Sequence, residues 1–341
     1  MNTLLTRLVF AISAGVIWGA SAHAADAPVS VNFENFARVE TDMQIDRMLK
    51  ASKGLNTFTH YRLPTPLDGQ TVIRMNRDTL YSFALVDISK GATITIPDAG
   101  KRYLSTMIIN NDGYINDVFY GGGTFKLNMD KFDTKYVVVA VRTLANASDE
   151  ADIKAANVLQ DKMKIEAASA EPFVMPDYDM DGYNATYKPL LELAKGLPST
   201  QKTFGSREIV DPVRFLLGTA FGWGGLPIED AYYLNVDPKL PIGEYQINVN
   251  DVPVDAFWSV SVYNKDGYFQ ENDFNSYSIN NISGKQNEDG SFTVNMGGCE
   301  DKRVNCVPLT EGWNYTVRLY KPGKELLDGS WMFPAAEAVK K

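Results

Sequence analysis

The chain contains two similar copies of one β-hairpin, and this internal repeat constrains the fold more than any other feature of the sequence. Residues 103–114 (YLSTMIINNDGY) reappear without a gap as residues 257–268 (FWSVSVYNKDGY). In each copy a run of β-branched and aromatic residues leads into an Asp-Gly turn, the pattern typical of a β-hairpin. The repeat therefore predicts two β-domains of one kind.

The segments around the two hairpins also match. Each copy follows a strand led by glycine, at 91–96 and 243–248, and each precedes a strand that ends in arginine, at 135–142 and 314–318. Turn residues divide the first half into further short strands. These are predicted at 72–75, 79–86, 93–96, 103–109, 114–120 and 136–141.

Helical segments are expected before and between the β-rich halves. Apolar residues at helical spacing predict a helix over 35–52 that Gly54 ends. Ala, Lys, Glu, Leu and Met dominate residues 148–170, and residues 184–195 and 208–217 are also helical by composition. The expected fold is mainly β with a helical connection. Its predicted parts are a signal peptide (1–24), an N-terminal helix plus first β-sandwich domain (25–147), a helical connecting segment (148–236) and a second β-sandwich domain (237–341).

The first residues have the pattern of an export signal. Arg7 precedes an apolar run over 8–17, and Ala22-His23-Ala24 is a small-residue cleavage site. The apolar run is shorter than the roughly 20 residues that span a bilayer. We therefore expect a soluble protein in a bacterial periplasm or outside the cell, with no membrane partner.

Charge and cysteine content narrow the partners and the compartment. The net charge is −9, and the basic residues are scattered, which argues against nucleic acid as a partner. Cys299 and Cys306, the two cysteines, flank a short polar loop. In an oxidising compartment such a pair is expected to form a disulfide, the alternative being two buried free thiols.

Histidine limits the chemistry. Once His23 leaves with the signal peptide, His60 is the one histidine of the mature chain. Nucleophilic triads that need histidine would have to use it, and multi-histidine metal sites are excluded.

The densest polar cluster is residues 74–82 (RMNRDTLYS). If this segment is extended, Arg74, Asn76 and Asp78 share one face, while Arg77 and Tyr81 lie on the apolar face. One interpretation is a ligand site in which the two arginines bind an anionic group. The other is a structural lock in which an arginine pairs with Asp78.

The chain resembles a known bacterial family. The 74–82 motif, with Asp87, Pro97 and Arg102-Tyr103, is similar to domain of unknown function 1254. The resemblance of the second half to domain of unknown function 1214 rests on FWSVSVY (257–263), Asn272, Tyr277, DGS (289–291), Trp313, RLY (318–320), Pro322 and DGSW (328–331). The resemblance covers nearly the whole mature chain and implies two tandem jelly-roll-like β-sandwich domains with a helical connection. It supplies no agreed catalytic residues.

An acidic loop resembles the first half of a calcium-binding loop. Asp177, Asp179, Asp181 and Gly182 have the required spacing, but the twelfth position is Lys188, where a bidentate glutamate is needed. We expect these acids to cap the following helix, with no metal and no cofactor.

The leading functional hypothesis is an exported protein that binds a small polar or anionic molecule in a cleft near 74–81, with hydrolysis as an open extension. The candidate ligand-binding residues are Arg74, Arg77, Asn76, Tyr81 and Tyr114. Asp78 and His60 are the candidate catalytic bases. The competing hypothesis is a non-catalytic binding or scaffold protein with a salt-bridge lock. Expected partners are an unknown small molecule and, as an open alternative, further copies of the chain.

Export is testable by mass. The mature protein should begin at Ala25 or one residue later, with Cys299 bonded to Cys306. Intact mass of periplasmic protein, measured after alkylation with and without reductant, checks both points. Two thiols that alkylate without reductant would contradict the disulfide.

Overall fold

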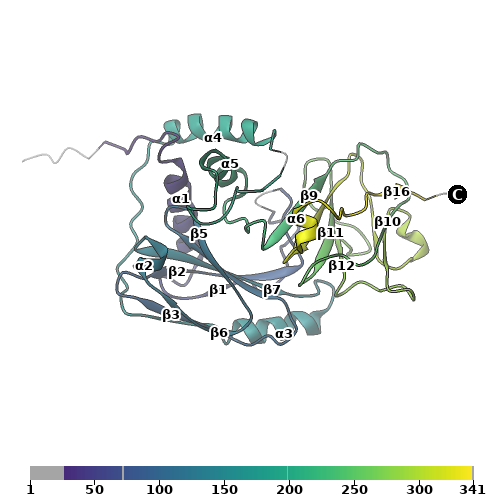
Figure 1. The fold of residues 1–341 in the computed structure, drawn as a ribbon, viewed down its shortest axis with the longest axis horizontal. Helices are drawn as coiled ribbons and strands as arrows, with labels where there is room; N and C mark the ends of the chain where they lie inside the picture. Colours follow the sequence, from purple (N-terminus) through teal and green to yellow (C-terminus); the bar gives the residue numbers. More distant parts are fainter. Residues whose placement is uncertain (1–26, 71–72, 198, 340–341) are drawn as a thin grey trace, which may run out of the picture.

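The computed structural model describes residues 27–70, 73–197 and 199–339, and over these ranges the fold is mainly β (Figure 1). The predicted signal peptide lies outside the described residues. Figure 1 shows two β-rich halves side by side, with helices α1, α4 and α5 gathered on one side of the first half. Among the described residues, none of the helices combines the length and apolar character that a membrane crossing requires.

The first half contains two sheets. The larger has the order β1-β2-β7-β4-β5, and the smaller has the order β6-β3-β8. The strands of the larger sheet are β1 (Thr59–His60), β2 (Thr79–Asp87), β7 (Tyr136–Leu144), β4 (Leu104–Asn110) and β5 (Ile115–Tyr120). Those of the smaller sheet are β6 (Gly123–Leu127), β3 (Ala92–Ile96) and β8 (Lys164–Ala167).

The central strand β7 faces two different cores because successive side chains point to opposite sides of a sheet. Val137, Val139 and Val141 join Ile94 and Ile96 of β3 in the core between the two sheets. Val138 and Ala140 face the other way and belong to the core that the first half shares with Phe257 and Tyr320 of the second half. Arg142, which ends the predicted strand, points to the same side of the sheet as Val138 and Ala140.

Helices cover part of the first half. The longer ones are α1 (Phe36–Ala51), α3 (Glu150–Gln160), α4 (Met180–Ala194) and α5 (Pro212–Gly222), and a short α2 spans Met129–Phe132. Helix α1 matches the predicted helix over 35–52. Asp179 caps α4, because its carboxylate accepts the N–H of Asp181 at 3.0 Å. The predicted capping role of the acidic loop is therefore confirmed.

The second half also has two sheets, with orders β14-β13-β10-β16 and β12-β11-β15-β9. The first consists of β14 (Cys306–Val307), β13 (Phe292–Met296), β10 (Tyr245–Val249) and β16 (Glu337–Ala338). The second consists of β12 (Ser278–Asn280), β11 (Trp258–Tyr263), β15 (Asn314–Tyr320) and β9 (Ala231–Val236), and a short helix α6 spans Lys324–Leu327. Buried residues of both sheets form one core around Trp258 and Trp313. Cys299 and Cys306 form a disulfide, as predicted.

The internal repeat is real at the level of strand pairing. Ser105 lies opposite Arg142 in the β4–β7 pair, and Ser259 lies opposite Arg318 in the β11–β15 pair. The turns match too: Asn110 accepts the N–H groups of residues 112 and 114 at 3.1 and 3.0 Å, and Asn264 accepts those of residues 266 and 268 at 3.0 and 3.0 Å. The copies differ after the turn. β5 starts at Ile115 and completes the first predicted hairpin, whereas the second copy has no strand until Ser278, so the predicted second hairpin is wrong.

Three further expectations from the sequence require correction. Residues 73–78 are not part of a strand, and Arg74 has a φ of 55°, so the faces predicted for this segment do not apply. Residues 164–167, expected to be helical by composition, pair with β3 as strand β8. Strand β9, which was not predicted, pairs with β15. Edge positions gain cross-strand bonds that composition does not encode. The proposed domain boundaries stay a prediction.

The turn of the second repeat can be tested by removing its side-chain acceptor. Asn264→Ala leaves two backbone N–H groups without a protein partner and should lower the free energy of unfolding by about 1–2 kcal/mol. Asn264→Asp keeps the acceptor and should lose less. Urea unfolding of both variants checks this, and equal losses would show that the acceptor is not what stabilises the turn.

Candidate functional site

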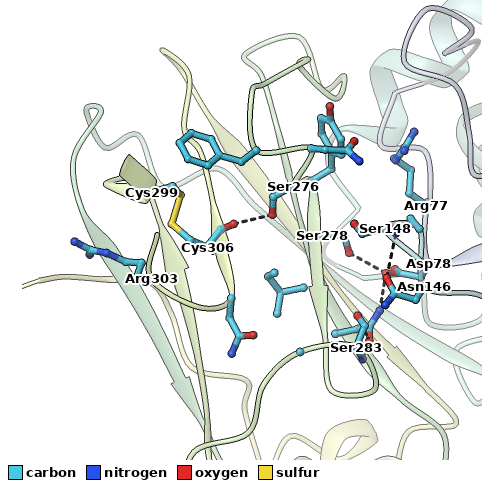
Figure 2. Close-up of a pocket in the computed structure, with 18 of the residues that line it drawn as sticks. Arg77, Asp78, Asn146, Ser148, Ser276, Ser278, Ser283, Cys299, Arg303 and Cys306 are labelled. Carbon is cyan, nitrogen blue, oxygen red and sulfur yellow. Dashed lines mark hydrogen bonds between the residues drawn. A yellow bond between two sulfur atoms is a disulfide. The ribbon is translucent and has the colours of Figure 1, made fainter. Parts of the chain in front are cut away.

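A polar cavity of about 430 Å³ lies between the two halves, within the range of about 300–1,000 Å³ typical of ligand sites. One wall consists of residues 77–78 and 145–148 of the first half. The other consists of residues 274–280 and 283–284 with part of the disulfide loop, residues 299–306. We call it the interdomain pocket. Figure 2 shows the disulfide at one side of this pocket and Asp78 at the other.

The backbone at Asp78 is fixed where β2 begins. Asn76 accepts the N–H of Asp78 at 2.8 Å, and the carbonyl of Asp78 accepts the N–H of Ala145 at 2.9 Å. Ala145 directly follows β7, so the main chain of the first half holds Asp78 at the end of its sheet. The Asp78 side chain turns toward the second half and is only 2% exposed.

The carboxylate of Asp78 is half satisfied. Its Oδ1 accepts hydrogen bonds from Ser278 Oγ at 2.8 Å and from Asn280 Nδ2 at 3.3 Å. Its Oδ2 is buried and has no hydrogen-bond partner among the described residues. Buried polar atoms are nearly always hydrogen-bonded, and an unsatisfied carboxylate oxygen is costly. Asp78 therefore offers a strong acceptor to a group that enters the pocket.

A chain of hydroxyls connects Asp78 to a buried arginine. Arg318 donates to Ser261 Oγ at 2.9 Å, Ser261 donates to Ser278 Oγ at 3.2 Å, and Ser278 donates to Asp78. Burial works to lower the pKa of Arg318, and the negative charge of Asp78 is among the groups that outweigh it and keep this pKa above the ordinary value. The charge of Asp78 therefore favours the charged form of Arg318 although the two side chains are not in direct contact.

Arg77 lines the same pocket but does not pair with Asp78. Its Nη1 donates to the carbonyl of Thr65, and its guanidinium carbon lies 4.9 Å from the centre of the Tyr277 ring. Figure 2 shows the Arg77 side chain directed away from the carboxylate of Asp78. Burial lowers the pKa of Arg77, and no ion pair to it is present in the described part of the chain. The predicted salt-bridge lock between these two residues does not form here.

The other residues of the predicted cluster do not line the pocket. Arg74 contacts the amide oxygen of Asn314 at 3.3 Å. Asn76 donates to the hydroxyls of Tyr81 and Tyr320 at 3.3 and 3.1 Å, inside the contact between the halves.

His60 and Tyr114 lie elsewhere. The His60 ring bonds Ser82 at 2.8 Å, and burial, with a smaller contribution from the charge of Arg62, lowers the pKa of His60 to about 4. Tyr114 stacks on Phe215 of α5 at 4.3 Å. Tyr114 lies at the far end of the sheet from Asp78, roughly 25 Å along the strands. The structure therefore brings Arg77 and Asp78 together at one cavity and separates both from these two residues.

The wall that the second half contributes was not predicted from the sequence. Ser278, Asn280 and Lys302 all line the pocket, and no local pattern points to them. Tyr277, which the Arg77 guanidinium contacts, is one of the residues on which the resemblance of the second half rests. Within the described ranges, no group of three or more His, Cys, Asp or Glu side chains could hold a metal ion.

The fold and pocket define a two-part, β-rich protein with a polar site at the junction of its halves. Residues 55–127 match the family model described as "Protein of unknown function (DUF1254)", and residues 238–324 match the one described as "Protein of unknown function (DUF1214)". The chain belongs to the family that combines these two domains. Arg77 and Asp78 lie in the first matched segment, and most of the opposite wall lies in the second.

Solved structures share this fold. The VPA0106 protein of Vibrio parahaemolyticus is 20% identical, with a TM-score of 0.70 over 90% of this chain and 98% of that chain. An uncharacterized protein of Burkholderia cenocepacia is 15% identical, with a TM-score of 0.52 over 90% of this chain and 87% of that chain. A comparison with curated proteins found no match.

The titration of His60 is a direct test of its environment. The NMR signal of the His60 ring should move with a midpoint of about pH 4 because burial disfavours the charged imidazolium. The unfolded chain takes up this proton near its ordinary pKa of about 6.5. Between these values the unfolded state binds more protons, so stability should fall as the pH is lowered through this window.

His60→Gln supplies the control, since it should remove this part of the pH dependence of the free energy of unfolding. A midpoint near the ordinary value would instead show that His60 is solvated, and it would restore His60 as a candidate base.

Proposed function

We propose that the chain binds a small polar molecule in the interdomain pocket, with a hydroxyl or amino group of the ligand on Asp78 and an anionic group toward the pocket's cations. The observation that carries the proposal is the buried, unpartnered Oδ2 of Asp78, a residue that lines the pocket. A ligand donor at this oxygen would complete the hydrogen bonding of the carboxylate, and charge-assisted hydrogen bonds are among the strong ones.

Arg77 on one wall and Lys302 on the opposite wall supply the positive charge of the site. Both line the pocket, and neither forms an ion pair among the described residues. Arg303 is different, because it pairs with Asp301 at 2.6 Å and with Glu244 at 2.8 Å. An anionic group would therefore find two cations without an ion pair, and Arg77 has N–H groups besides the one bonded to Thr65.

The rest of the lining suits a hydroxyl-rich or amide-bearing ligand. It is dominated by short polar side chains: Ser148, Ser276, Ser278, Ser283, Asn146, Asn275, Asn280 and Asn305. These side chains both donate and accept hydrogen bonds. They favour small hydroxy acids, amino acids or sugar acids over an apolar ligand.

Binding has more support than hydrolysis. His60, the second candidate base, bonds Ser82 and does not line the pocket. Ser278 donates to Asp78 without a histidine between them, so the arrangement lacks the base that activates serine in a triad. The scaffold alternative has less support than binding, because it depends on an ion pair between an arginine and Asp78 that is not formed in the described residues.

The architecture and the compartment are part of the same proposal. In each half, buried residues of two sheets pack into a shared core, which supports two tandem jelly-roll-like sandwiches with the pocket between them. The disulfide supports export to the periplasm or the exterior, because disulfides persist in oxidising compartments.

Ligand screening with two matched variants tests the proposal. Purified protein is screened by thermal shift and native mass spectrometry against small hydroxy acids, amino acids and sugar acids. Arg77→Met and Asp78→Asn should each weaken the affinity for the best ligand at least tenfold, about 1.4 kcal/mol, since each removes one charged contact. Lys195→Met, on an exposed cation directly after α4, should leave the affinity unchanged.

Circular dichroism of each variant shows whether it is folded before its affinity is read. Unchanged affinity in both pocket variants would place the ligand elsewhere, and the absence of any ligand from the whole panel would favour the scaffold alternative.

A further inference from the structure

A second buried arginine lies at the junction of the halves, apart from the interdomain pocket. Arg142 is on the central strand β7 and is 8% exposed. Its cross-strand partners are Tyr81 on β2 and Ser105 on β4. Cross-strand partners point to the same face of a sheet. These three side chains therefore lie in a row on the face turned toward the second half. Arg142 does not line the interdomain pocket.

The guanidinium of Arg142 is incompletely satisfied. Its Nη2 donates to the carbonyl of Gly224 at 3.1 Å, and its central carbon lies 5.7 Å from the centre of the Tyr81 ring. Its Nη1 is buried and has no hydrogen-bond partner among the described residues. Asp230 is near enough to influence Arg142 but forms no ion pair with it, and its carboxylate accepts the Tyr120 hydroxyl at 2.7 Å.

Two hydroxyls beside this guanidinium are also without further partners. Ser105 Oγ and the hydroxyl of Tyr103 are buried and lie close to each other, and neither has another hydrogen-bond partner within the described residues. Tyr103 packs against Tyr320 at 5.3 Å and senses the charge of Arg142. Phenols are neutral at neutral pH, so the neighbouring tyrosines supply no counter-charge. One cationic N–H group and two hydroxyls are therefore without a further protein partner in the same part of the interface, and no carboxylate is paired with the guanidinium in the described residues.

The repeat provides an internal comparison. Arg318 occupies the same register position in the second half, where it pairs with Ser259 as Arg142 pairs with Ser105. Arg318 is satisfied: it donates to Ser261 at 2.9 Å, to Tyr263 at 2.8 Å and to the carbonyl of Arg74 at 2.7 Å. Protein atoms can therefore satisfy the hydrogen bonds of an arginine at this register position, as they do for Arg318. At Arg142 they leave Nη1 without a partner.

We propose that Arg142, Ser105 and Tyr103 bind a small inorganic anion, of the size of chloride, at the junction of the two halves. The anion accepts a hydrogen bond from the guanidinium Nη1 and one from each hydroxyl, and it neutralises a buried charge that is otherwise costly. A compact ion suits the position because all three donor atoms are closed to solvent. The inference does not depend on the ligand of the interdomain pocket.

The test compares salts at constant ionic strength. Thermal unfolding of the full chain is followed in sodium bromide or chloride, with sodium gluconate as the bulky-anion reference. Because a ligand that binds the native state stabilises it, the melting temperature should rise by about 2 °C or more for each tenfold increase in halide above its dissociation constant. Arg142→Met should lose this increment. Arg207→Met, on an exposed arginine, should keep it.

Bromide in a crystal of the wild-type protein gives a second readout that does not require a folded variant. An anomalous peak within hydrogen-bonding distance of Arg142 Nη1 supports the proposal. It is overturned if the wild-type melting temperature is the same in halide and gluconate, or if bromide-soaked crystals show density at this position without an anomalous signal, as water would give.

Discussion

The junction between the two halves depends on Arg318, a buried cation that the second half cannot satisfy alone. It reaches across to the carbonyls of Arg74 and Met75 while its own sheet supplies hydroxyls. A guanidinium that is buried without hydrogen bonds would cost several kcal/mol. The hydrogen bonds of Arg318 therefore favour the position of the 74–78 segment in which the carbonyls of Arg74 and Met75 face it. That segment leads directly into Asp78. The same interaction that joins the halves therefore places the carboxylate at the pocket.

The two arginines show how a repeated unit can diverge without changing its strand pairing. Both follow the same register opposite a serine. One is completed by main chain from the other half, whereas the other faces tyrosine rings and unbonded hydroxyls. Each copy of the repeat thus presents a polar residue to the shared interface, and the surroundings of that residue decide whether it is structural or open to a ligand. A duplicated fold can acquire distinct sites in this way.

Local signals predicted most of the first half. Helix α1, strands β2 to β5 and β7, the first hairpin, the turn of the second copy and the disulfide all followed from periodicity, turn residues and cysteine spacing. The failures have long-range causes. The 74–78 segment is not extended because Arg74 N–H bonds the carbonyl of Gly267, far along the chain. Arg77 and Asp78 were identified from their charge and setting, but their partners Tyr277 and Ser278 come from a wall that no local pattern links to them.

The disulfide has a consequence for when the pocket exists. Ser276 Oγ donates to the carbonyl of Cys306 at 2.7 Å. This hydrogen bond connects the residues just before β12, which begins at Ser278, to the loop that the disulfide closes. With the thiols reduced, this loop gains conformational entropy and holds the wall less firmly. A chain with both cysteines reduced would therefore have a less firmly held pocket wall. Formation of the disulfide would then complete this wall, so the shape of the interdomain pocket depends on the redox state of Cys299 and Cys306.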